Sequence, residues 1–229
     1  MTTFVLIHGA YQGGWIWKPV AERLRTKGHL VLTPTLDGCA ERKDQIRAGI
    51  DTETHAAEIA GLLFYQDLKD VVLAGTSTGG MVMARAAELA RERVGRLVFA
   101  DALALLDGEA LPDFVKRPTA VNTELATGQS RQDLETRLFV DFDPALRAWA
   151  LDRCTPHPIA AMQAPVRLER FWDQTWNASV IWCKRSPNPP VAHQRRAAER
   201  LKARWHELDT GHYPMLTEPE ALARLIAEG

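Results

Sequence analysis

The sequence has few of the features that mark secreted, metal-binding or disulfide-stapled proteins. Its 229 residues include three cysteines, Cys39, Cys154 and Cys183. This small, odd and widely spaced set excludes a disulfide framework and matches no zinc-ligand spacing. We therefore expect free thiols in a reducing compartment, and neither a metal nor another cofactor.

Charge and hydropathy give no reason to expect a polyanionic or lipid partner. The formal net charge is −1, so no electrostatic case exists for nucleic acid or an anionic membrane surface. No apolar run approaches the roughly 20 residues needed to cross a bilayer. The first strand begins near Thr3, without a preceding basic region or signal-length apolar segment. The expected location is the cytoplasm, and a homodimer is left open.

The chain does contain a regular alternation of strand-like and helix-like segments. Hydrophobic residues make up 46% and charged residues 25%, which is ordinary for one α/β domain with an insertion. Alternation of this kind predicts a mostly parallel sheet flanked by helices. The predicted strands are 3–7, 29–33, 70–75, 96–101, 178–183 and 205–208, and the predicted helices are 17–27, 52–66, 79–92, 191–203 and 217–227.

The most informative motif is Gly-x-Ser-x-Gly at Gly75–Gly79, between an apolar strand and a helix-like stretch. A serine on such a sharp turn is presented at the strand's end, above a helix N-terminus. Glycines at 75 and 79 would remove Cβ atoms that clash in the turn. Ser77 is thus the candidate nucleophile, whereas the plain alternative is a Gly/Ser-rich connecting turn.

Two further segments supply partners for a nucleophilic serine. A glycine-rich loop, His8–Trp15, follows the first strand and can offer a backbone N–H to an oxyanion, as can Thr78. His212 lies in a loop after the last strand, Trp205–Leu208, near the C-terminus. That position matches the order serine, acid, histidine, and imidazole has the near-neutral pKa that a general base needs.

These segments together resemble the α/β-hydrolase group that contains plant methyl-ester esterases, hydroxynitrile lyases and related bacterial esterases. The likeness rests on residues 8–17, 33–38, 74–81 and 209–212. It implies the α/β-hydrolase fold, with Ser77 as nucleophile and His212 as base. The N–H groups of Ala10 and Thr78 would form the oxyanion hole.

Two departures from this group bear on the chemistry. The lyases carry a hydroxyl residue after the first histidine and a lysine after the catalytic one, whereas this chain has Gly9 and Tyr213. Without that cation to stabilise a leaving cyanide, hydrolysis is favoured. The family also places its acid in the loop after the penultimate strand, but the loop Lys184–Pro190 contains no carboxylate.

Asp101 is the candidate replacement for that acid. It ends the strand that follows the serine's helix, and residues at the carboxyl ends of parallel strands converge on one crevice. The resemblance permits this, since some lipases of the fold place the acid there. Two alternatives stay open: Asp101 caps the following segment, or a Ser77–His212 dyad is assisted by Ser186 or Asn188.

Residues 103–177 interrupt the alternation and predict a helical lid, inserted between a core formed by residues 1–102 and 178–229. The expected lid helices are 131–140, 144–153 and 165–172. Tyr11, Trp149 and Trp172 are expected to line the pocket beneath it, which would suit a small apolar or aromatic ester.

The sequence therefore predicts a serine esterase whose partner is a small-molecule ester. Ser77 would form an acyl-enzyme, with His212 as general base. Fold alone does not decide the chemistry. The alternatives are a non-hydrolytic enzyme, such as a lyase or a polyketide-type cyclase, and a ligand-binding protein that retains the pocket.

Overall fold

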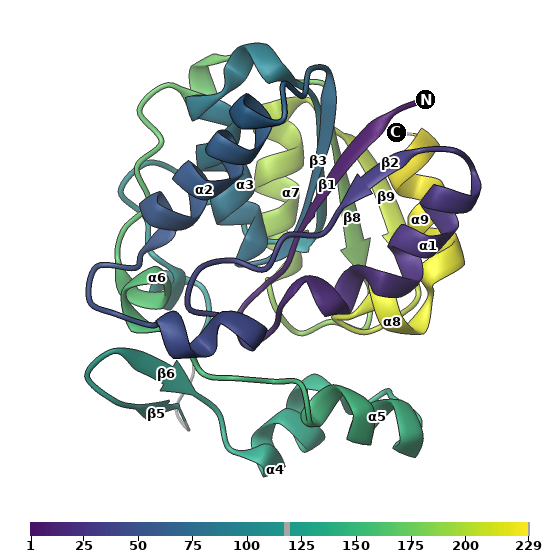
Figure 1. Ribbon diagram of the computed structural model, residues 1–229. Coiled ribbons are helices and arrows are strands. Elements are labelled where there is room, and N and C mark those ends of the chain that lie inside the picture. Colours follow the sequence, from purple (N-terminus) through teal and green to yellow (C-terminus); the bar gives the residue numbers. More distant parts are fainter. Residues whose placement is uncertain (117–119, 229) are drawn as a thin grey trace.

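The computed structural model describes residues 1–116 and 120–228 and is built around a six-stranded parallel sheet (Figure 1). The strand order is β2-β1-β3-β4-β8-β9, and every neighbouring pair is parallel. The inner strands β1 and β3 are mostly apolar and buried because both faces of the sheet are covered, whereas the edge strand β9 is polar and partly exposed. The strands are β1 (Thr3–Ile7), β2 (Leu30–Leu32), β3 (Val71–Ser77), β4 (Val94–Ala102), β8 (Ala178–Cys183) and β9 (Arg204–Leu208).

Helices cover both faces of the sheet, so two apolar cores form (Figure 1). One core joins the sheet to α2, α3 and α7, and the other joins it to α1, α8 and α9. The predicted core helices are confirmed to within a few residues at their ends. They are α1 (Lys18–Thr26), α2 (Thr52–Tyr65), α3 (Gly79–Leu89), α7 (Val191–Leu201) and α9 (Pro219–Glu228), and the short helix α8 (Pro214–Thr217) was not predicted.

The segment expected to form the lid lies beyond the end of the sheet toward which β8 points (Figure 1). It combines short helices with a three-stranded antiparallel sheet, β5-β6-β7, which the sequence analysis did not anticipate. Its elements are β5 (Val121–Asn122), β6 (Ala126–Gly128), α4 (Arg131–Asp133), the π-turn η5 (Leu134–Leu138), α5 (Pro144–Leu151), β7 (His157–Pro158) and α6 (Ile159–Gln163).

One predicted lid helix is wrong. Residues 165–170 form no helix, and a 3₁₀ turn, η6 (Phe171–Asp173), begins only at the end of the predicted segment. The reason is that backbone groups here bond to a distant segment: Val166 donates its N–H to the Glu109 carbonyl, and Gly108 donates to Val166. The other two are present in shortened form, the first as α4 and η5 and the second as α5.

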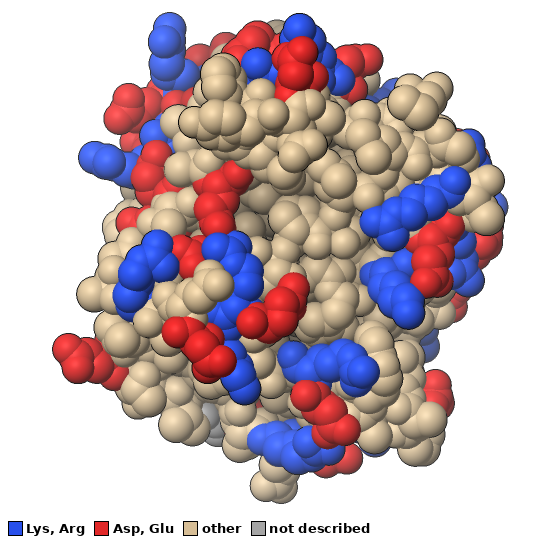
Figure 2. All heavy atoms as spheres, viewed as in Figure 1, with Lys and Arg blue, Asp and Glu red and all other residues tan. Residues whose placement is uncertain are grey.

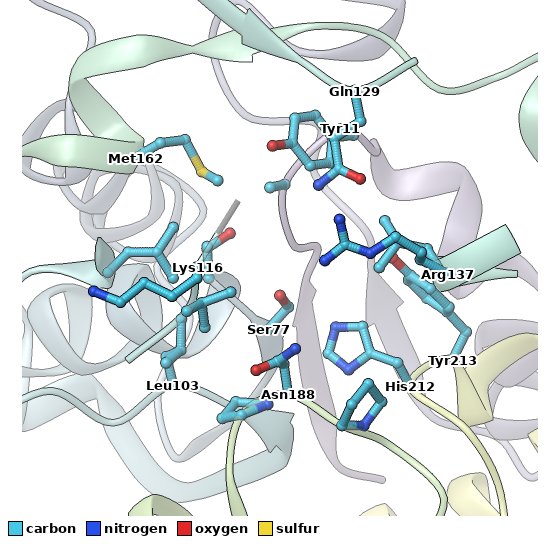
Figure 3. A pocket seen from close by; sticks show the side chains of 17 residues that line it. Tyr11, Ser77, Leu103, Lys116, Gln129, Arg137, Met162, Asn188, His212 and Tyr213 are labelled. Carbon is cyan, nitrogen blue, oxygen red and sulfur yellow. The ribbon is translucent and has the colours of Figure 1, made fainter. Parts of the chain in front are cut away.

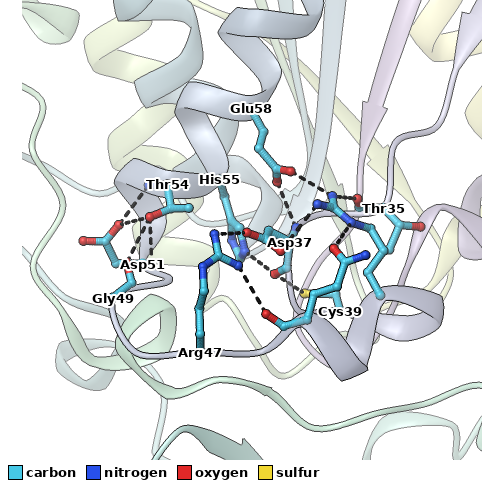
Figure 4. A network of polar contacts seen from close by, with 11 residues as sticks. Thr35, Asp37, Cys39, Arg47, Gly49, Asp51, Thr54, His55 and Glu58 are labelled. Atoms are coloured by element: carbon cyan, nitrogen blue, oxygen red, sulfur yellow. Dashed lines mark hydrogen bonds and ion pairs between the residues drawn. The ribbon is translucent and has the colours of Figure 1, made fainter.

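A buried polar network fixes the long loop between β2 and α2 (Figure 4). The Asp37 carboxylate pairs with Arg47 at 2.6 Å and with Arg42 at 3.4 Å. The hydrogen bond from Arg47 lowers the pKa of Asp37. Glu58 of α2 accepts the Asp37 N–H at 2.8 Å, and His55 Nε2 bonds the Asp37 carbonyl at 2.9 Å. The loop is therefore held to α2 from several directions.

This fixed loop in turn supports the glycine-rich loop after β1. The Leu36 N–H donates to His8 Nε2 at 3.0 Å, and His8 Nδ1 bonds the Gly9 carbonyl at 2.8 Å. Farther along, the Ala40 N–H donates to Thr155 Oγ1, and the Thr155 N–H donates to the Tyr11 carbonyl. The two loops and the segment before β7 are thus joined beside the sheet's carboxyl edge.

The face seen in Figure 2 carries side chains of both signs, intermixed rather than gathered by sign. In residues 1–116 and 120–228, no helix combines the length and the apolar character of a membrane span.

Candidate active site

Ser77 ends β3 on a turn that only glycine neighbours allow. Its φ is +51°, in the left-handed region that costs a non-glycine residue about 1 kcal/mol or more. A Cβ on Gly75 would lie 2.7 Å from the Gly79 carbonyl oxygen. A Cβ on Gly79 would lie 2.6 Å from the carbonyl oxygens of Ile7 and His8. The predicted clash within the turn is confirmed for Gly75, whereas at Gly79 the clash is with the end of β1 and not with the turn itself.

The glycine-rich loop lies against the serine. A Cβ on Gly9 would be 2.7 Å from the Ser77 Cβ, so the lack of a side chain lets the two segments touch. Ala10 and Thr78 line the same cavity as Ser77. Among the hydrogen bonds of the described residues, none uses the backbone N–H of Ala10 or Thr78. Both donors are therefore available to a bound oxyanion.

The structure brings Asp101 and His212 together. His212 Nδ1 lies 2.6 Å from Asp101 Oδ2, a hydrogen-bond distance. The Asp101 side chain is fully buried, and the His212 side chain is 11% exposed. Asp101 has a φ of +47°, so the backbone turns at the end of β4. Its Oδ1 accepts from Cys183 N–H and Gln194 rather than from the segment that follows, so the capping alternative does not hold.

The loop that lacks a carboxylate also reaches His212. Ser186 Oγ lies 3.4 Å from His212 Nδ1 and donates to the Asn188 carbonyl at 2.8 Å. This contact is longer than the bond to Asp101 and weaker for that reason. Asp141 accepts the Gly211 N–H at 3.1 Å, so the segment expected to form the lid also holds the histidine loop.

Ser77 and His212 lie next to one another at the cavity floor (Figure 3). Among the hydrogen bonds of the described residues, none joins the Ser77 hydroxyl to the imidazole. Such bonds are often long without substrate and tighten when it binds. Ser77 and His212 thus line one cavity, and Asp101 contacts the imidazole at Nδ1.

The cavity above Ser77 measures about 720 Å³, including the space at its open mouth. The apolar lining residues include Leu103, Leu111, Val115 and Met162, and Figure 3 shows Lys116 between Met162 and Leu103 on one side. The opposite side is polar: Figure 3 shows the Arg137 guanidinium pointing into the space between Gln129 and Ser77. The Gln129 Oε1 is buried without a hydrogen-bond partner among the described residues. The other lining residues are Ala10, Tyr11, Thr78, Leu138, Pro187, Asn188, Pro189, His212 and Tyr213.

Of the three predicted pocket residues, Tyr11 lines the cavity and the two tryptophans do not. Trp149 packs edge-on against Trp15 with ring centroids 5.2 Å apart, on the α1 side of the sheet. Trp172 donates its Nε1–H to the Leu105 carbonyl at 3.0 Å and packs on the opposite core. The prediction for both is corrected: packing against core segments on either side of the sheet turns them away from the cavity.

Sequence reasoning missed several residues of this site. Gln194, Gln129 and Arg137 stand outside any motif, and their positions depend on contacts between distant segments. Tyr213 could have been found from the sequence, because it directly follows His212. It lines the cavity, and burial raises the pKa of its phenol. Within the part of the chain that the structure describes, no group of three or more His, Cys, Asp or Glu side chains could hold a metal.

Comparison with known proteins identifies the family and the fold. Residues 4–225 match the alpha/beta hydrolase family. A carbendazim hydrolyzing esterase of Nocardioides sp. (strain SG-4G) is 32% identical over 73% of this chain and 74% of its own length. Methylesterase 3 of Arabidopsis thaliana is 25% identical over 98% of this chain and 94% of its own length. An extracellular α/β-hydrolase from a Paenibacillus species superposes with a TM-score of 0.85 at 23% identity, covering 100% of this chain and 98% of that one. These matches confirm the resemblance and the fold.

Proposed function

The chain belongs to the alpha/beta hydrolase family, and we propose that it is a carboxylic ester hydrolase with Ser77 as nucleophile. The observation that carries the proposal is the 2.6 Å bond from His212 to Asp101 in a site that Ser77 shares. An imidazole held at Nδ1 by a carboxylate presents its other nitrogen, Nε2, toward a serine. The esterase names of the relatives support the reaction class.

The reaction proceeds in two steps. Ser77 Oγ attacks the ester carbonyl while His212 Nε2 takes the hydroxyl proton, and Asp101 stabilises the imidazolium. The carbonyl oxygen, now negative, is bound by the N–H groups of Ala10 and Thr78. His212 returns the proton to the leaving alcohol, which departs and leaves an acyl-serine. Water then attacks the acyl carbon by the same route and releases the acid.

The cavity favours an ester with an apolar or aromatic body and one polar substituent. The body would lie along the apolar side chains of Leu103, Val115 and Met162. The polar side presents the Arg137 guanidinium and the buried Gln129 amide oxygen, which calls for a hydrogen-bonding group on the substrate. A small methyl ester whose acyl part carries a hydroxyl group meets both demands, because a hydroxyl donates to the Gln129 oxygen and can also accept from a guanidinium.

Two other functions make different demands on the same site. A lyase or cyclase would use Ser77 as an acid or base without forming an acyl-enzyme. A binding protein would hold its ligand without turnover. The strained backbone at Ser77 suits all three functions, whereas Gly9 and Tyr213 stand where the lyases carry a hydroxyl residue and a lysine, which disfavours the lyase.

The test is covalent labelling of Ser77. A fluorophosphonate probe should label the wild-type protein, and p-nitrophenyl acetate should give a burst of nitrophenol. Ser77→Ala should abolish both, while His212→Ala should slow labelling strongly and leave folding intact. A folded wild-type protein that neither takes the probe nor hydrolyses a short ester would overturn the esterase proposal.

We further propose a reducing compartment such as the cytoplasm. Cys39, Cys154 and Cys183 are all free thiols. Burial raises the pKa of the Cys154 thiol to about 12, so it is protonated and unreactive at neutral pH.

A further inference from the structure

The carboxylate of Asp101 is held on the side away from His212 by one buried amide. Oδ2 bonds His212, whereas Oδ1 accepts from Gln194 Nε2 at 2.7 Å and from the Cys183 N–H at 3.4 Å. Gln194 lies in the first turn of α7 and is 1% exposed. Its amide thus makes the shortest contact to this oxygen.

The same amide also binds the wall of the cavity. Gln194 Nε2 donates to the Pro189 carbonyl at 3.0 Å, and Pro187, Asn188 and Pro189 line the cavity beside Ser77. One side chain therefore ties Asp101 to the loop that lacks an acid of its own.

A carboxylate at the position of Asp101 needs such a partner. The group is fully buried, and a buried charge is costly unless it accepts hydrogen bonds on its free lone pairs. A carboxylate held at one oxygen can still turn about its Cβ–Cγ bond, which would move Oδ2 away from the imidazole. The second bond, to Oδ1, prevents that rotation. An amide suits the task because it donates and has no acidic proton to exchange with His212.

We infer that Gln194 is a positioning residue of the active site, acting through Asp101. This inference rests on the proposed function, since it assumes that Asp101 orients His212. Gln194 touches neither the cavity nor Ser77, so its effect should fall on kcat and leave KM unchanged. Displacement of a catalytic group by about 1 Å can cost 10²-fold, so a loss of roughly 10- to 100-fold is expected.

The deciding experiment is a double-mutant cycle on the full-length protein, with p-nitrophenyl acetate as substrate. Gln194→Met keeps the length of the side chain and removes its donor. In the wild-type background it should lower kcat by roughly 10- to 100-fold at unchanged KM. In an Asp101→Asn background it should change kcat by less than about twofold, because its route to His212 is already broken. Equal losses in both backgrounds would show that Gln194 acts through the Pro189 loop instead, and would overturn the inference.

A matched control separates positioning from general loss of a buried hydrogen bond. His193, the neighbour of Gln194 on α7, is also buried and accepts the Ala104 N–H at 3.0 Å without touching Asp101. His193→Ala should lower the melting temperature about as much as Gln194→Met and leave kcat within about threefold of wild type. If Gln194→Met fails to fold, Gln194→Leu also removes the donor and places no charge beside Asp101, so it enters the same cycle.

NMR provides a measurement that a loss of stability alone would not change. The low-field NMR resonance of the His212 Nδ1 proton should shift in Gln194→Met, disappear in Asp101→Asn and stay in place in His193→Ala. An unmoved resonance in Gln194→Met would contradict the inference. Labelling of wild-type Ser77 by a fluorophosphonate tests the proposed function separately, so failure of the cycle in a labelled protein counts against Gln194 alone.

Discussion

His212 donates a hydrogen bond from Nδ1 to Asp101, a residue 111 positions earlier in the chain, over 2.6 Å. The strand order β4-β8-β9 explains how they meet. Asp101 ends β4, beside the serine's strand, and the loop that carries His212 after β9 reaches back across the end of β8. The imidazole is therefore approached by a carboxylate from β4 and by the Ser186 hydroxyl from the loop after β8.

The two contacts to His212 predict unequal effects. Asp101→Asn should lower kcat by up to about 10⁴-fold with KM and folding little changed, because the imidazole loses its orientation and its preferred tautomer. Ser186→Ala should stay within about threefold of wild type, since a 3.4 Å contact is weak. Steady-state kinetics on both variants, with circular dichroism as the folding control, makes the comparison. A larger loss of kcat in Ser186→Ala than in Asp101→Asn would assign the orienting role to Ser186.

The turn at Ser77 predicts opposite outcomes for two glycine-to-alanine changes. Gly79→Ala should destabilise the protein by about 3 kcal/mol or more, because its Cβ would lie 2.6 Å from two backbone oxygens. Gly61→Ala, in the exposed part of α2 with no atom within 4 Å of the new Cβ, should be neutral or stabilising by about 0.5–1 kcal/mol. Urea unfolding measures both. Similar losses of unfolding free energy in the two variants would show that the close backbone contact is not the reason for glycine at position 79.

Two buried histidines predict a loss of stability in mild acid. Burial lowers the pKa of His8 to about 4 and that of His193 to about 4, from 6.5. Between about pH 4 and about pH 6.5 the unfolded chain therefore binds more protons than the folded protein. The stability that the two neutral histidines contribute is complete above about pH 6.5 and is lost as the pH falls toward 4. At about pH 5 the loss is on the order of 2 kcal/mol for each histidine.

The control for this prediction is His193→Gln, which keeps an acceptor for the Ala104 N–H and cannot titrate. Its urea midpoint should fall less than that of wild type between about pH 7 and about pH 5. Parallel decreases in the two proteins would contradict the assigned role of His193.

The polar side of the cavity predicts a selectivity that depends on Arg137. Monomethyl terephthalate and methyl p-toluate share a shape, but only the first carries a carboxylate acceptor. Arg137→Gln should lower the ratio of their kcat/KM values by about tenfold, the equivalent of one charge-assisted hydrogen bond. Arg131→Ala removes a cation paired with Asp152, outside the cavity, and should leave the ratio unchanged. Equal ratios in wild type and Arg137→Gln would place the guanidinium outside the substrate's reach.

Local sequence accounts for the core and for the placement of Ser77. Most residues of β3 and β4 are apolar, so both strands were predicted within a few residues of their observed ends. The reason for Gly75 is local, because its Cβ would meet the Gly79 carbonyl, whereas the reason for Gly79 is a contact with Ile7 and His8 at the end of β1. Asp101 was open to two interpretations because its sequence neighbours are the same whether it caps a turn or meets an imidazole.

Local sequence patterns were enough to predict the strands, the core helices, the turn at Ser77 and the loop that carries His212. Tertiary structure alone decided which polar groups meet His212, since Asp101, Ser186 and Gln194 come from three separate elements. It also decided that Trp149 and Trp172 pack away from the cavity and that residues 165–170 bond to Gly108 and Glu109 instead of forming a helix. The physical reason is common to all of these: each depends on hydrogen bonds and packing between segments far apart in the chain, which no local pattern records.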